Sequence, residues 1–188
     1  MPSRLRSRLR LAAARRRAGG RIEGAHGVRI GRGVVLDVAA GGNVTLGPGV
    51  VLADRCRLHV GPRAAVVVGA GARLGERSVV TAHERVEIGA GAALGMEAVI
   101  VDFDHVVADP ETPVRLQGLV TAPVILGERA ALDATAVVLR GVTVGAGARV
   151  GVRSVVRADV PPGATVAGVP ARPPGAPGPR GRRLARRR

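Results

Sequence analysis

The stretch that decides the fold reads "VILGERAALDATAVVLRGVTVGAGARVGVRSVV", residues 124–156. Small residues surround an aliphatic residue that recurs every six positions, at Leu126, Leu132, Val138, Val144, Val150 and Val156. This period predicts a solenoid, in which three short strands make a triangular coil of about 18 residues, and stacked coils bury one column of aliphatic side chains. Small residues suit the tight corners, where a bulky side chain would clash.

The same six-residue step continues upstream of residue 124. It is regular at Val68, Leu74 and Val80 and again at Ile88, Leu94 and Ile100, and looser at Ile30, Leu36, Leu46 and Leu52. The glycine-rich stretches "VGAGARLG" (68–75) and "VGAGARVG" (144–151) lie in phase with it, and no long helix pattern follows either one. The repeat therefore argues against nucleotide-binding glycine loops.

The composition suits one domain of 188 residues with an unusual core. Trp and Tyr are absent and Phe occurs once, so burial depends on many small aliphatic side chains. The single cysteine, Cys56, excludes an intramolecular disulfide and is typical of a reducing cytoplasm. No apolar run approaches the roughly 18 residues of a membrane-spanning helix, and no secretory signal is apparent. We expect a cytoplasmic protein.

The net charge of +15 is concentrated at the two ends of the chain. Residues 22–171 hold 14 acidic residues and 14 arginines, whereas eight arginines precede residue 22 and seven follow from Arg172 onward. The pattern predicts a basic N-terminal segment with a short helix (1–21), a solenoid domain (22–172) and a disordered Pro/Gly/Arg-rich tail (173–188).

Such tails are expected to contact a polyanion, unless they are functionally silent. The favoured partner is acidic phospholipid at the cytoplasmic face of the inner membrane, where the protein would be peripheral. RNA or DNA is the alternative, and any such binding should be nonspecific, because Phe103 is the only phenylalanine, tyrosine or tryptophan available to stack on bases.

Residues 101–122 interrupt the solenoid pattern and begin "VDFDHVVADPETPVRLQG" (101–118). Solenoids accept insertions as loops on one face, which is often the functional face. The insertion carries His105, which is either a surface histidine or a functional one. Asp102, Asp104 and Asp109 lie within four residues of it, and each is a candidate for fixing the tautomer of the imidazole.

At this point the chain resembles a known family. "DFDHVVADPETPVRLQG" (102–118), "GVTVG" (141–145) and the closing "VVxxDVPPGxxVAGVPAR" (155–172) are similar to the acetyl-CoA-dependent hexapeptide acyltransferases, of the type that O-acetylates sugars and exopolysaccharides. The match covers roughly residues 60–172. It implies an all-β, left-handed parallel β-helix that forms a homotrimer, with the active site in the groove between neighbouring solenoids and no metal.

The resemblance also assigns roles to individual residues. His105 becomes the general base that takes the proton from a sugar hydroxyl as the oxygen attacks the thioester of acetyl-CoA. The coenzyme contacts fall near Ala134 and Val152, through backbone groups, and at Arg157 and Arg172. The last of these is expected to meet a phosphate.

The chain departs from the family pattern in two places. Ala131 stands where tryptophan is usual, and Asp133 stands where glycine is usual. The asparagine and aspartate that bind the acceptor in the galactoside enzymes align with Gly75 and His83. A sugar or glycan acceptor is therefore expected, but not one of the galactoside type.

Two other functions stay open at the level of sequence. His59, His83 and His105 resemble the zinc ligands of the γ-class carbonic anhydrases, although their spacings of 24 and 22 residues do not match a pair five residues apart. The departures at Ala131 and Asp133 leave room for a non-catalytic scaffold. His26 is expected to be a surface residue.

Overall fold

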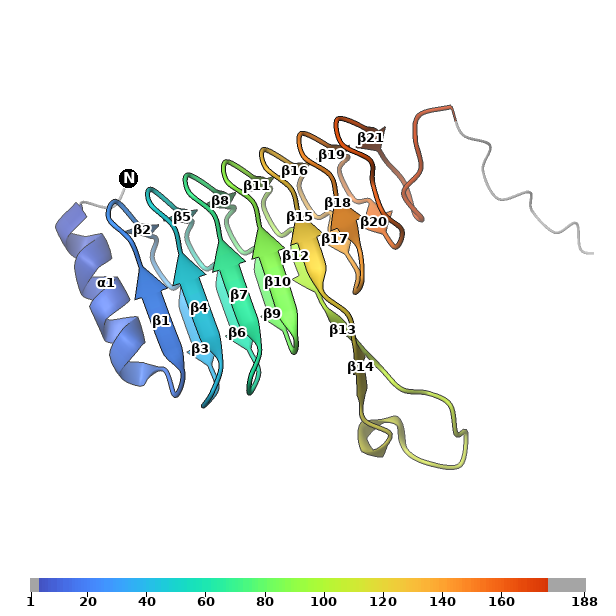
Figure 1. The fold of residues 1–188 in the computed structure, drawn as a ribbon, viewed down its shortest axis with the longest axis horizontal. Helices are drawn as coiled ribbons and strands as arrows, with labels where there is room; N and C mark the ends of the chain where they lie inside the picture. Colours follow the sequence, from blue (N-terminus) through green and yellow to red (C-terminus); the bar gives the residue numbers. More distant parts are fainter. Residues whose placement is uncertain (1–3, 176–188) are drawn as a thin grey trace, which may run out of the picture.

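The computed structural model describes residues 4–175, so most of the C-terminal tail predicted to be disordered lies outside the described residues. The chain winds into a column whose three walls are parallel β-sheets (Figure 1). It rises along one wall, passes over the top and descends behind while it advances along the column, which makes the β-helix left-handed (Figure 1). The predicted fold class is confirmed.

Each coil contributes one strand to each sheet. The first sheet contains β1 (Arg21–Gly24), β4 (Asn43–Leu46), β7 (Ala65–Val68), β10 (Arg85–Ile88), β15 (Val124–Leu126) and β18 (Thr143–Val144). The second contains β2 (Arg29–Ile30), β5 (Val51–Leu52), β8 (Arg73–Leu74), β11 (Ala93–Leu94), β16 (Ala131–Leu132), β19 (Arg149–Val150) and β21 (Thr165–Val166). The third contains β3 (Val35–Val38), β6 (Arg57–Val60), β9 (Val79–Ala82), β12 (Val99–Val101), β17 (Val137–Val138) and β20 (Val155–Val156).

The core is the column of aliphatic side chains that the six-residue step predicts. All six residues that this step marks between Leu126 and Val156 are buried, with 2% exposure or less. The glycine-rich stretches form corners of the coil, where Gly71 and Gly147 adopt φ values of +68° and +67°. These left-handed conformations explain the glycines without a nucleotide.

The early coils are longer than the predicted 18 residues. Arg21 pairs with Asn43 and Asn43 pairs with Ala65, a repeat of 22 residues, whereas Ile125 pairs with Thr143 after 18. Strands of the early coils in the first and third sheets have four residues, and apart from β1, whose second inward position is Gly24, each has two inward side chains, as at Val44 and Leu46 of β4. The prediction of 18 residues is therefore correct for the late coils and wrong for the first ones, where the step is looser.

The N-terminal segment contains α1 (Arg4–Arg17), which lies across the open end of the first coil (Figure 1). Leu11 packs against the core, and the buried Ser7 hydroxyl accepts the Ile30 N–H at 3.2 Å. The chain then passes Gly20, where an added Cβ would lie 2.4 Å from the Ala39 carbonyl oxygen. The predicted basic helix is confirmed, and no helix within residues 4–175 is long and apolar enough to cross a membrane.

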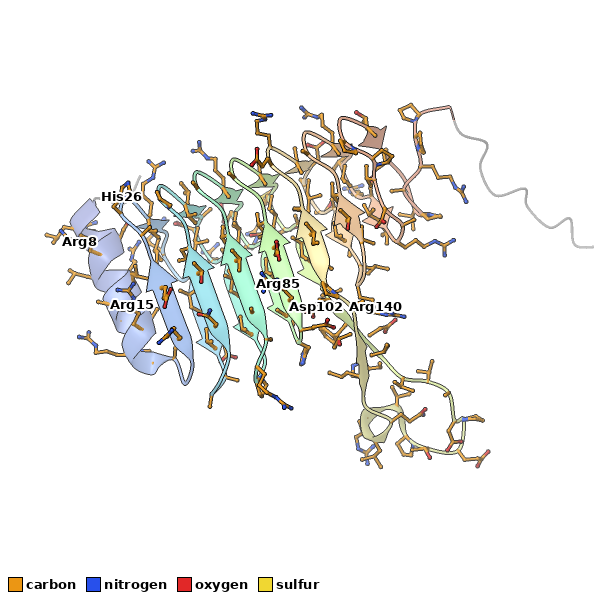
Figure 2. The ribbon with its side chains drawn as sticks, viewed as in Figure 1. Arg8, Arg15, His26, Arg85, Asp102 and Arg140 are labelled. Atoms are coloured by element: carbon orange, nitrogen blue, oxygen red, sulfur yellow. The ribbon has the colours of Figure 1, made fainter. Side chains whose placement is uncertain are left out.

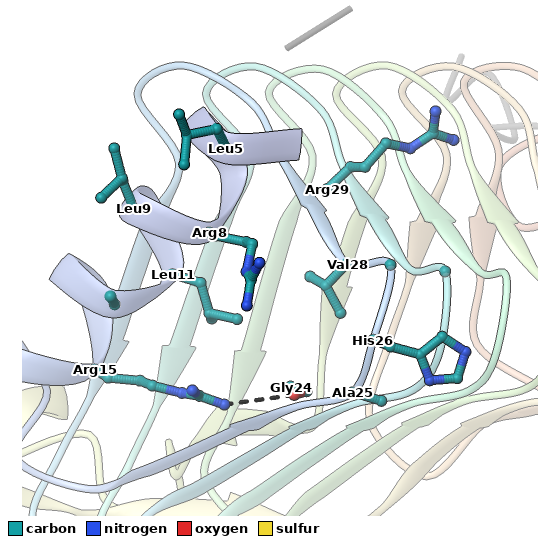
Figure 3. Close-up of a pocket in the computed structure, with 13 residues that line it drawn as sticks. Leu5, Arg8, Leu9, Leu11, Arg15, Gly24, Ala25, His26, Val28 and Arg29 are labelled. Carbon is teal, nitrogen blue, oxygen red and sulfur yellow. Dashed lines mark hydrogen bonds between the residues drawn. The ribbon is translucent and has the colours of Figure 1, made fainter. Parts of the chain in front are cut away.

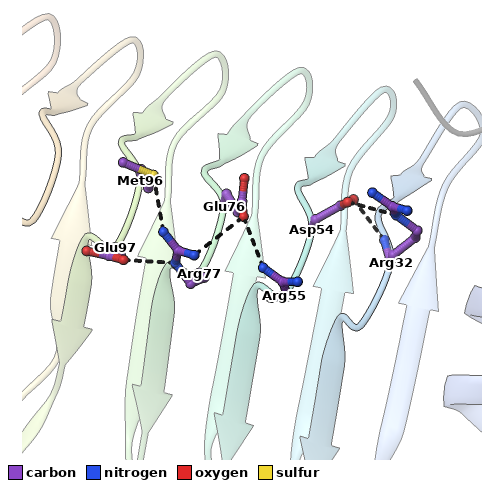
Figure 4. Close-up of polar contacts among 7 residues, drawn as sticks. All are labelled: Arg32, Asp54, Arg55, Glu76, Arg77, Met96 and Glu97. Carbon is purple, nitrogen blue, oxygen red and sulfur yellow. Dashed lines mark hydrogen bonds and ion pairs between the residues drawn. The ribbon is translucent and has the colours of Figure 1, made fainter.

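One corner of the column, between the second and third sheets, carries a ladder of charged side chains (Figure 4). Arg32 pairs with Asp54, Arg55 with Glu76, and Arg77 with Glu97. Main-chain hydrogen bonds also join successive coils at this corner, since the Arg77 N–H donates to the Asp54 carbonyl one coil earlier. The corner keeps the same register through the late coils, so Ala134 and Val152 occupy the positions that Asp54 and Glu76 hold earlier.

Candidate functional site

The insertion is a β-hairpin that leaves the column between the third and first sheets. It follows β12, pairs β13 (Phe103–His105) with β14 (Leu119–Thr121) in antiparallel fashion, and returns to β15. His105 lies opposite Leu119, and the hairpin projects clear of the column (Figure 1). This interruption of the repeat was expected as a loop at 101–122, and it places His105 on an ordered strand.

The tip of the hairpin is organised by Asp109. Its carboxylate accepts the Thr112 hydroxyl at 2.6 Å and the Glu111 N–H at 2.9 Å. The side-chain amide of Gln117, which follows the 3-10 turn at Val114–Leu116, closes the loop by donating to the main-chain carbonyls of Asp109 and Thr112 that precede the turn. The hydroxyl of Thr112, followed by the Glu111 N–H, lowers the pKa of the Asp109 carboxyl group.

The base of the hairpin is anchored by Asp102, which is fully buried. Its carboxylate accepts three main-chain N–H groups at 2.7–2.8 Å, from His83, Glu84 and Arg85. These residues form the tight turn between β9 and β10 in the preceding coil, so Asp102 ties the hairpin to that turn (Figure 2). A buried carboxylate that accepts three N–H bonds is a rigid anchor, because its removal leaves three main-chain donors without their acceptor.

Three rings meet above this anchor. The Phe103 ring contacts the His83 ring edge-on with centroids 4.5 Å apart, and its centroid lies 6.1 Å from that of the His105 ring. The only phenylalanine of the chain therefore packs between a histidine of the column and the histidine of the hairpin. These contacts join the base of the hairpin to the column.

The carboxylates near His105 do not orient its imidazole. Asp102 is committed to the turn of the preceding coil, Asp104 accepts the main-chain N–H of His105 at 2.8 Å, and Asp109 lies at the tip. The expectation that one of them fixes the tautomer is therefore wrong for the described residues. The exposed imidazole keeps its nitrogens available to a ligand or to another chain.

The residues predicted to contact a coenzyme lie at a different corner from the hairpin. Ala134 and Val152 follow β16 and β19, one above the other, between the second and third sheets. At the equivalent position of the first coil, the Arg32 N–H donates to the Asp54 carboxylate at 2.9 Å. The N–H groups of Ala134 and Val152 have no partner in the part of the chain that the structure describes, so they are free to donate to a ligand carbonyl.

The two arginines predicted to contact the coenzyme lie at different places on the column. Arg172 exchanges two main-chain hydrogen bonds of 2.9 Å with Ala167, which stacks on Gly151, so it lies at the same end of this corner as Val152. Arg157 instead follows β20 on the third sheet. Both side chains are exposed. The structure thus brings together Ala134, Val152 and Arg172, and it places His105 and Arg157 elsewhere.

Sequence reasoning missed Arg140, which lies beside the base of the hairpin (Figure 2). The next residue, Gly141, donates its N–H to the Ala122 carbonyl at the end of the insertion. The Arg140 side chain is exposed and forms no ion pair or hydrogen bond with any residue in the range 4–175. The only feature of the sequence that could have pointed to Arg140 was its position one coil after the insertion.

Metal ligands and a reactive thiol do not assemble in the described part of the chain. No three His, Cys, Asp or Glu side chains of residues 4–175 gather as a metal site. His59 instead pairs with Asp37 at 3.3 Å, and Phe103 packs between His83 and His105. Burial raises the pKa of the Cys56 thiol to about 11, so it is not a thiolate nucleophile at neutral pH.

Comparison with known proteins begins at the level of sequence. No protein-family model matches the chain. A curated protein of Mycobacterium tuberculosis, named as a probable acetyltransferase, is 31% identical over 99 residues. This alignment covers 53% of the chain and 33% of the relative, so the chain spans about a third of that protein's length.

Solved structures resemble the chain more extensively. The N-acyltransferase AntD of Bacillus cereus, in complex with coenzyme A and dTDP-4-amino-4,6-dideoxyglucose, superposes with a TM-score of 0.62 at 19% identity, over 79% of this chain and 82% of AntD. A hexapeptide-repeat acetyltransferase of Vibrio cholerae, complexed with acetyl coenzyme A, gives 0.60 at 20% identity, over 88% and 75%. The class of structure is therefore clear: the chain is a left-handed parallel β-helix interrupted by a hairpin.

Proposed function

We propose that this protein is an acyltransferase that moves an acetyl group from acetyl-CoA to a hydroxyl of a sugar or glycan precursor, with His105 as the general base. The similar proteins support the reaction class, since the solved neighbours are named as acyltransferases and are bound to coenzyme A or acetyl coenzyme A. The curated relative carries a name of the same kind.

The single observation that carries the proposal is the division of the site between two corners of the column. His105 stands on a hairpin anchored by Asp102 between the third and first sheets, whereas the free N–H groups of Ala134 and Val152 lie between the second and third. A single chain therefore carries both halves of the site, the base on the hairpin and the N–H groups of the coenzyme corner, but holds them at different corners. A homotrimer in which the hairpin of one subunit meets the coenzyme corner of its neighbour joins them.

The residues of this chain suit the donor at the coenzyme corner. The N–H groups of Ala134 and Val152 donate to amide carbonyls of acetyl-CoA, and Arg172 contacts a phosphate. At this corner the early coils carry the ion pairs of Figure 4, whereas Ala134 and Val152 are small and uncharged. The late coils also carry one ion pair, between Asp133 and Arg149 at 3.8 Å, but the positions of Ala134 and Val152 themselves hold no charged side chain.

His105 supplies the proton transfer. The imidazole takes the proton of the acceptor hydroxyl while its oxygen attacks the thioester carbonyl, which forms a C–O bond. Collapse of the tetrahedral intermediate breaks the C–S bond, and the proton passes from the imidazolium to the departing thiolate. Acetyl ester and free coenzyme A leave, and no oxidant or metal is consumed.

The acceptor has a second candidate, an amino group. AntD is named as an N-acyltransferase and is bound to an amino-sugar nucleotide. An amine is a better nucleophile than a hydroxyl. It still has to lose a proton when it is acylated, and His105 would accept that proton as it would from a hydroxyl. Arg140, exposed and unpaired within residues 4–175, lies beside the hairpin base and suits the diphosphate of a nucleotide sugar in either case.

The chemical nature of the product, an ester or an amide, distinguishes a hydroxyl acceptor from an amine acceptor. The full chain is incubated with acetyl-CoA and a panel of nucleotide sugars and oligosaccharides, with and without amino groups, and thiol release is recorded. Ester products are cleaved by mild alkali and amides survive it. We expect alkali-labile product from hydroxyl acceptors; alkali-stable product alone would assign N-acylation, and release from neither class would favour a non-catalytic scaffold.

A further inference from the structure

The helix α1 shows two different faces. Its inner face is buried against the first coil through Ser7 and Leu11, as expected for residues four apart on one side of a helix. Leu5 and Leu9, also four residues apart, are 67% and 61% exposed. They form one apolar stripe on the outside of the molecule, where burial in the core does not account for them.

The stripe lies in a strongly basic helix. Seven of its 14 residues are arginine and none is acidic. Arg10 and Arg15 serve the fold, since they donate to the Ile30 and Ile22 carbonyls at 2.9 and 3.0 Å. Arg8, beside the two leucines, is exposed and has no partner among the residues from 4 to 175. The outer side of α1 therefore combines apolar side chains with positive charge, the two features by which a helix binds an anionic membrane surface.

A hollow of about 1250 Å³ opens beside this stripe, between α1 and the first coil (Figure 3). Leu5 and Leu9 line it on the helix side together with Arg8, and His26 lines it on the coil side. The hollow therefore offers both apolar surface and cationic groups. A phospholipid, whose phosphate lies next to the start of its acyl chains, has the same two requirements.

We propose that the outer face of α1 and this hollow are a docking surface for an anionic phospholipid bilayer. Leu5 and Leu9 enter the boundary between headgroups and acyl chains, while Arg8 and its neighbours contact lipid phosphates. Nucleic acid would satisfy the charge but leave both leucines in water. The combination of charge and apolar stripe on one face therefore favours lipid.

The surface is formed before binding. Ser7 and Arg10 fix α1 to Ile30 of the first coil, so the helix does not have to fold on the membrane, and docking avoids that ordering cost. The helix covers the end of the column, whereas the hairpin projects from its side at later coils (Figure 1). Docking through α1 leaves the hairpin accessible to a soluble acceptor.

The test is flotation of the full chain with vesicles of phosphatidylcholine that contain about 30% phosphatidylserine, compared with phosphatidylcholine alone. We expect binding to the anionic vesicles only, weaker at about 0.5 M than at about 0.1 M salt. The variant Leu5→Ser/Leu9→Ser should lose about tenfold or more in apparent affinity, because two leucines no longer leave water.

The matched control is Val107→Ser/Leu116→Ser. It removes two side chains of the hairpin that are 70% and 67% exposed, and should float with anionic vesicles like the unchanged chain. All four substituted side chains are exposed, so each variant should keep the unfolding temperature of the original, which is measured alongside.

Three results would overturn the proposal. The first is undiminished flotation of the Leu5→Ser/Leu9→Ser variant. The second is loss of flotation when residues 176–188 are deleted while the leucine variant still floats, which assigns the charge effect to the tail alone. The third is salt-sensitive binding to an RNA oligonucleotide without any flotation, which makes α1 a general polycation.

Discussion

The Phe103 ring lies edge-on against the His83 ring, with centroids 4.5 Å apart. One residue belongs to the hairpin and the other to a turn of the column, so this contact joins the base of the hairpin to the column. The main-chain N–H of His83 is bound by Asp102 at 2.7 Å. Packing and hydrogen bonding therefore hold the same turn and the same hairpin base, two residues before His105.

The ring contact predicts that Phe103 is a positioning residue. Phe103→Leu keeps an apolar side chain but loses the edge-on contact with His83, so His105 should be less well aligned. We expect kcat to fall about tenfold with the KM for acetyl-CoA unchanged, and Phe103→Tyr to restore most of kcat. Steady-state kinetics of thiol release measure both; equal losses in the leucine and tyrosine variants would count against positioning through the ring.

His105→Ala should lower kcat by about 10²–10⁴, the usual effect of removing a general base. Affinity for coenzyme A should stay unchanged, because the proposed coenzyme contacts are the N–H groups of Ala134 and Val152 and the Arg172 side chain, not the imidazole. Calorimetric titration measures the affinity and thiol release the rate. His59→Ala is the matched control, since His59 pairs with Asp37 on the third sheet, away from the hairpin. Near-full activity of the His105 variant would remove it from the mechanism.

The divided site predicts that two inactive variants complement each other. Ala134→Glu should fit sterically, because Glu76 occupies the equivalent position two coils earlier, yet it should block the coenzyme corner. Mixing it with His105→Ala under subunit exchange creates junctions with both halves intact, so activity should return.

Light scattering should give a mass near three times the 19.1 kDa of one chain. Activity that never returns on mixing, although mass spectrometry detects mixed oligomers, would contradict a shared site. A monomer with full activity would contradict it as well.

The Asp102 anchor predicts a large loss of stability. Asp102→Ala leaves three main-chain N–H groups at the base of the hairpin without their acceptor, and should lower the free energy of unfolding by about 3 kcal/mol. Asp102→Asn keeps an acceptor oxygen and should lose less. Urea denaturation measures both. Asp104→Ala, exposed on the adjacent strand, should change stability by less than about 0.5 kcal/mol; a comparable loss there would deny Asp102 its special role.

Burial predicts an unreactive thiol at Cys56. Its pKa is raised to about 11, from 9.0 in an unperturbed cysteine, chiefly by desolvation. The folded protein should therefore resist iodoacetamide at pH 8 and react on unfolding. Because the unfolded chain ionises first, this group lowers the free energy of unfolding between pH 9 and 11 and contributes nothing below that window. Rapid labelling of the folded chain at pH 8 would contradict the burial.

The fold could be predicted from residues that repeat. An aliphatic side chain every six positions has to point inward each time, so the column and its corners could be anticipated from Leu126 to Val156, and the place of the insertion from the break in the step between Ile100 and Leu126. The longer early coils were missed because Leu36 and Val38 both point inward on a four-residue strand, and the pattern of one inward residue per strand does not describe that case.

The candidate site could be predicted in its members but not in its arrangement. The sequence by itself determined the solenoid, the basic helix and His105 in an insertion, because periodicity and local composition depend on neighbouring residues. Only the tertiary structure decided that Asp102 binds the turn at His83 rather than the imidazole, and that His105 and Ala134 lie at different corners. Such contacts join residues about one coil apart, and their geometry depends on how coils stack, which no local pattern records.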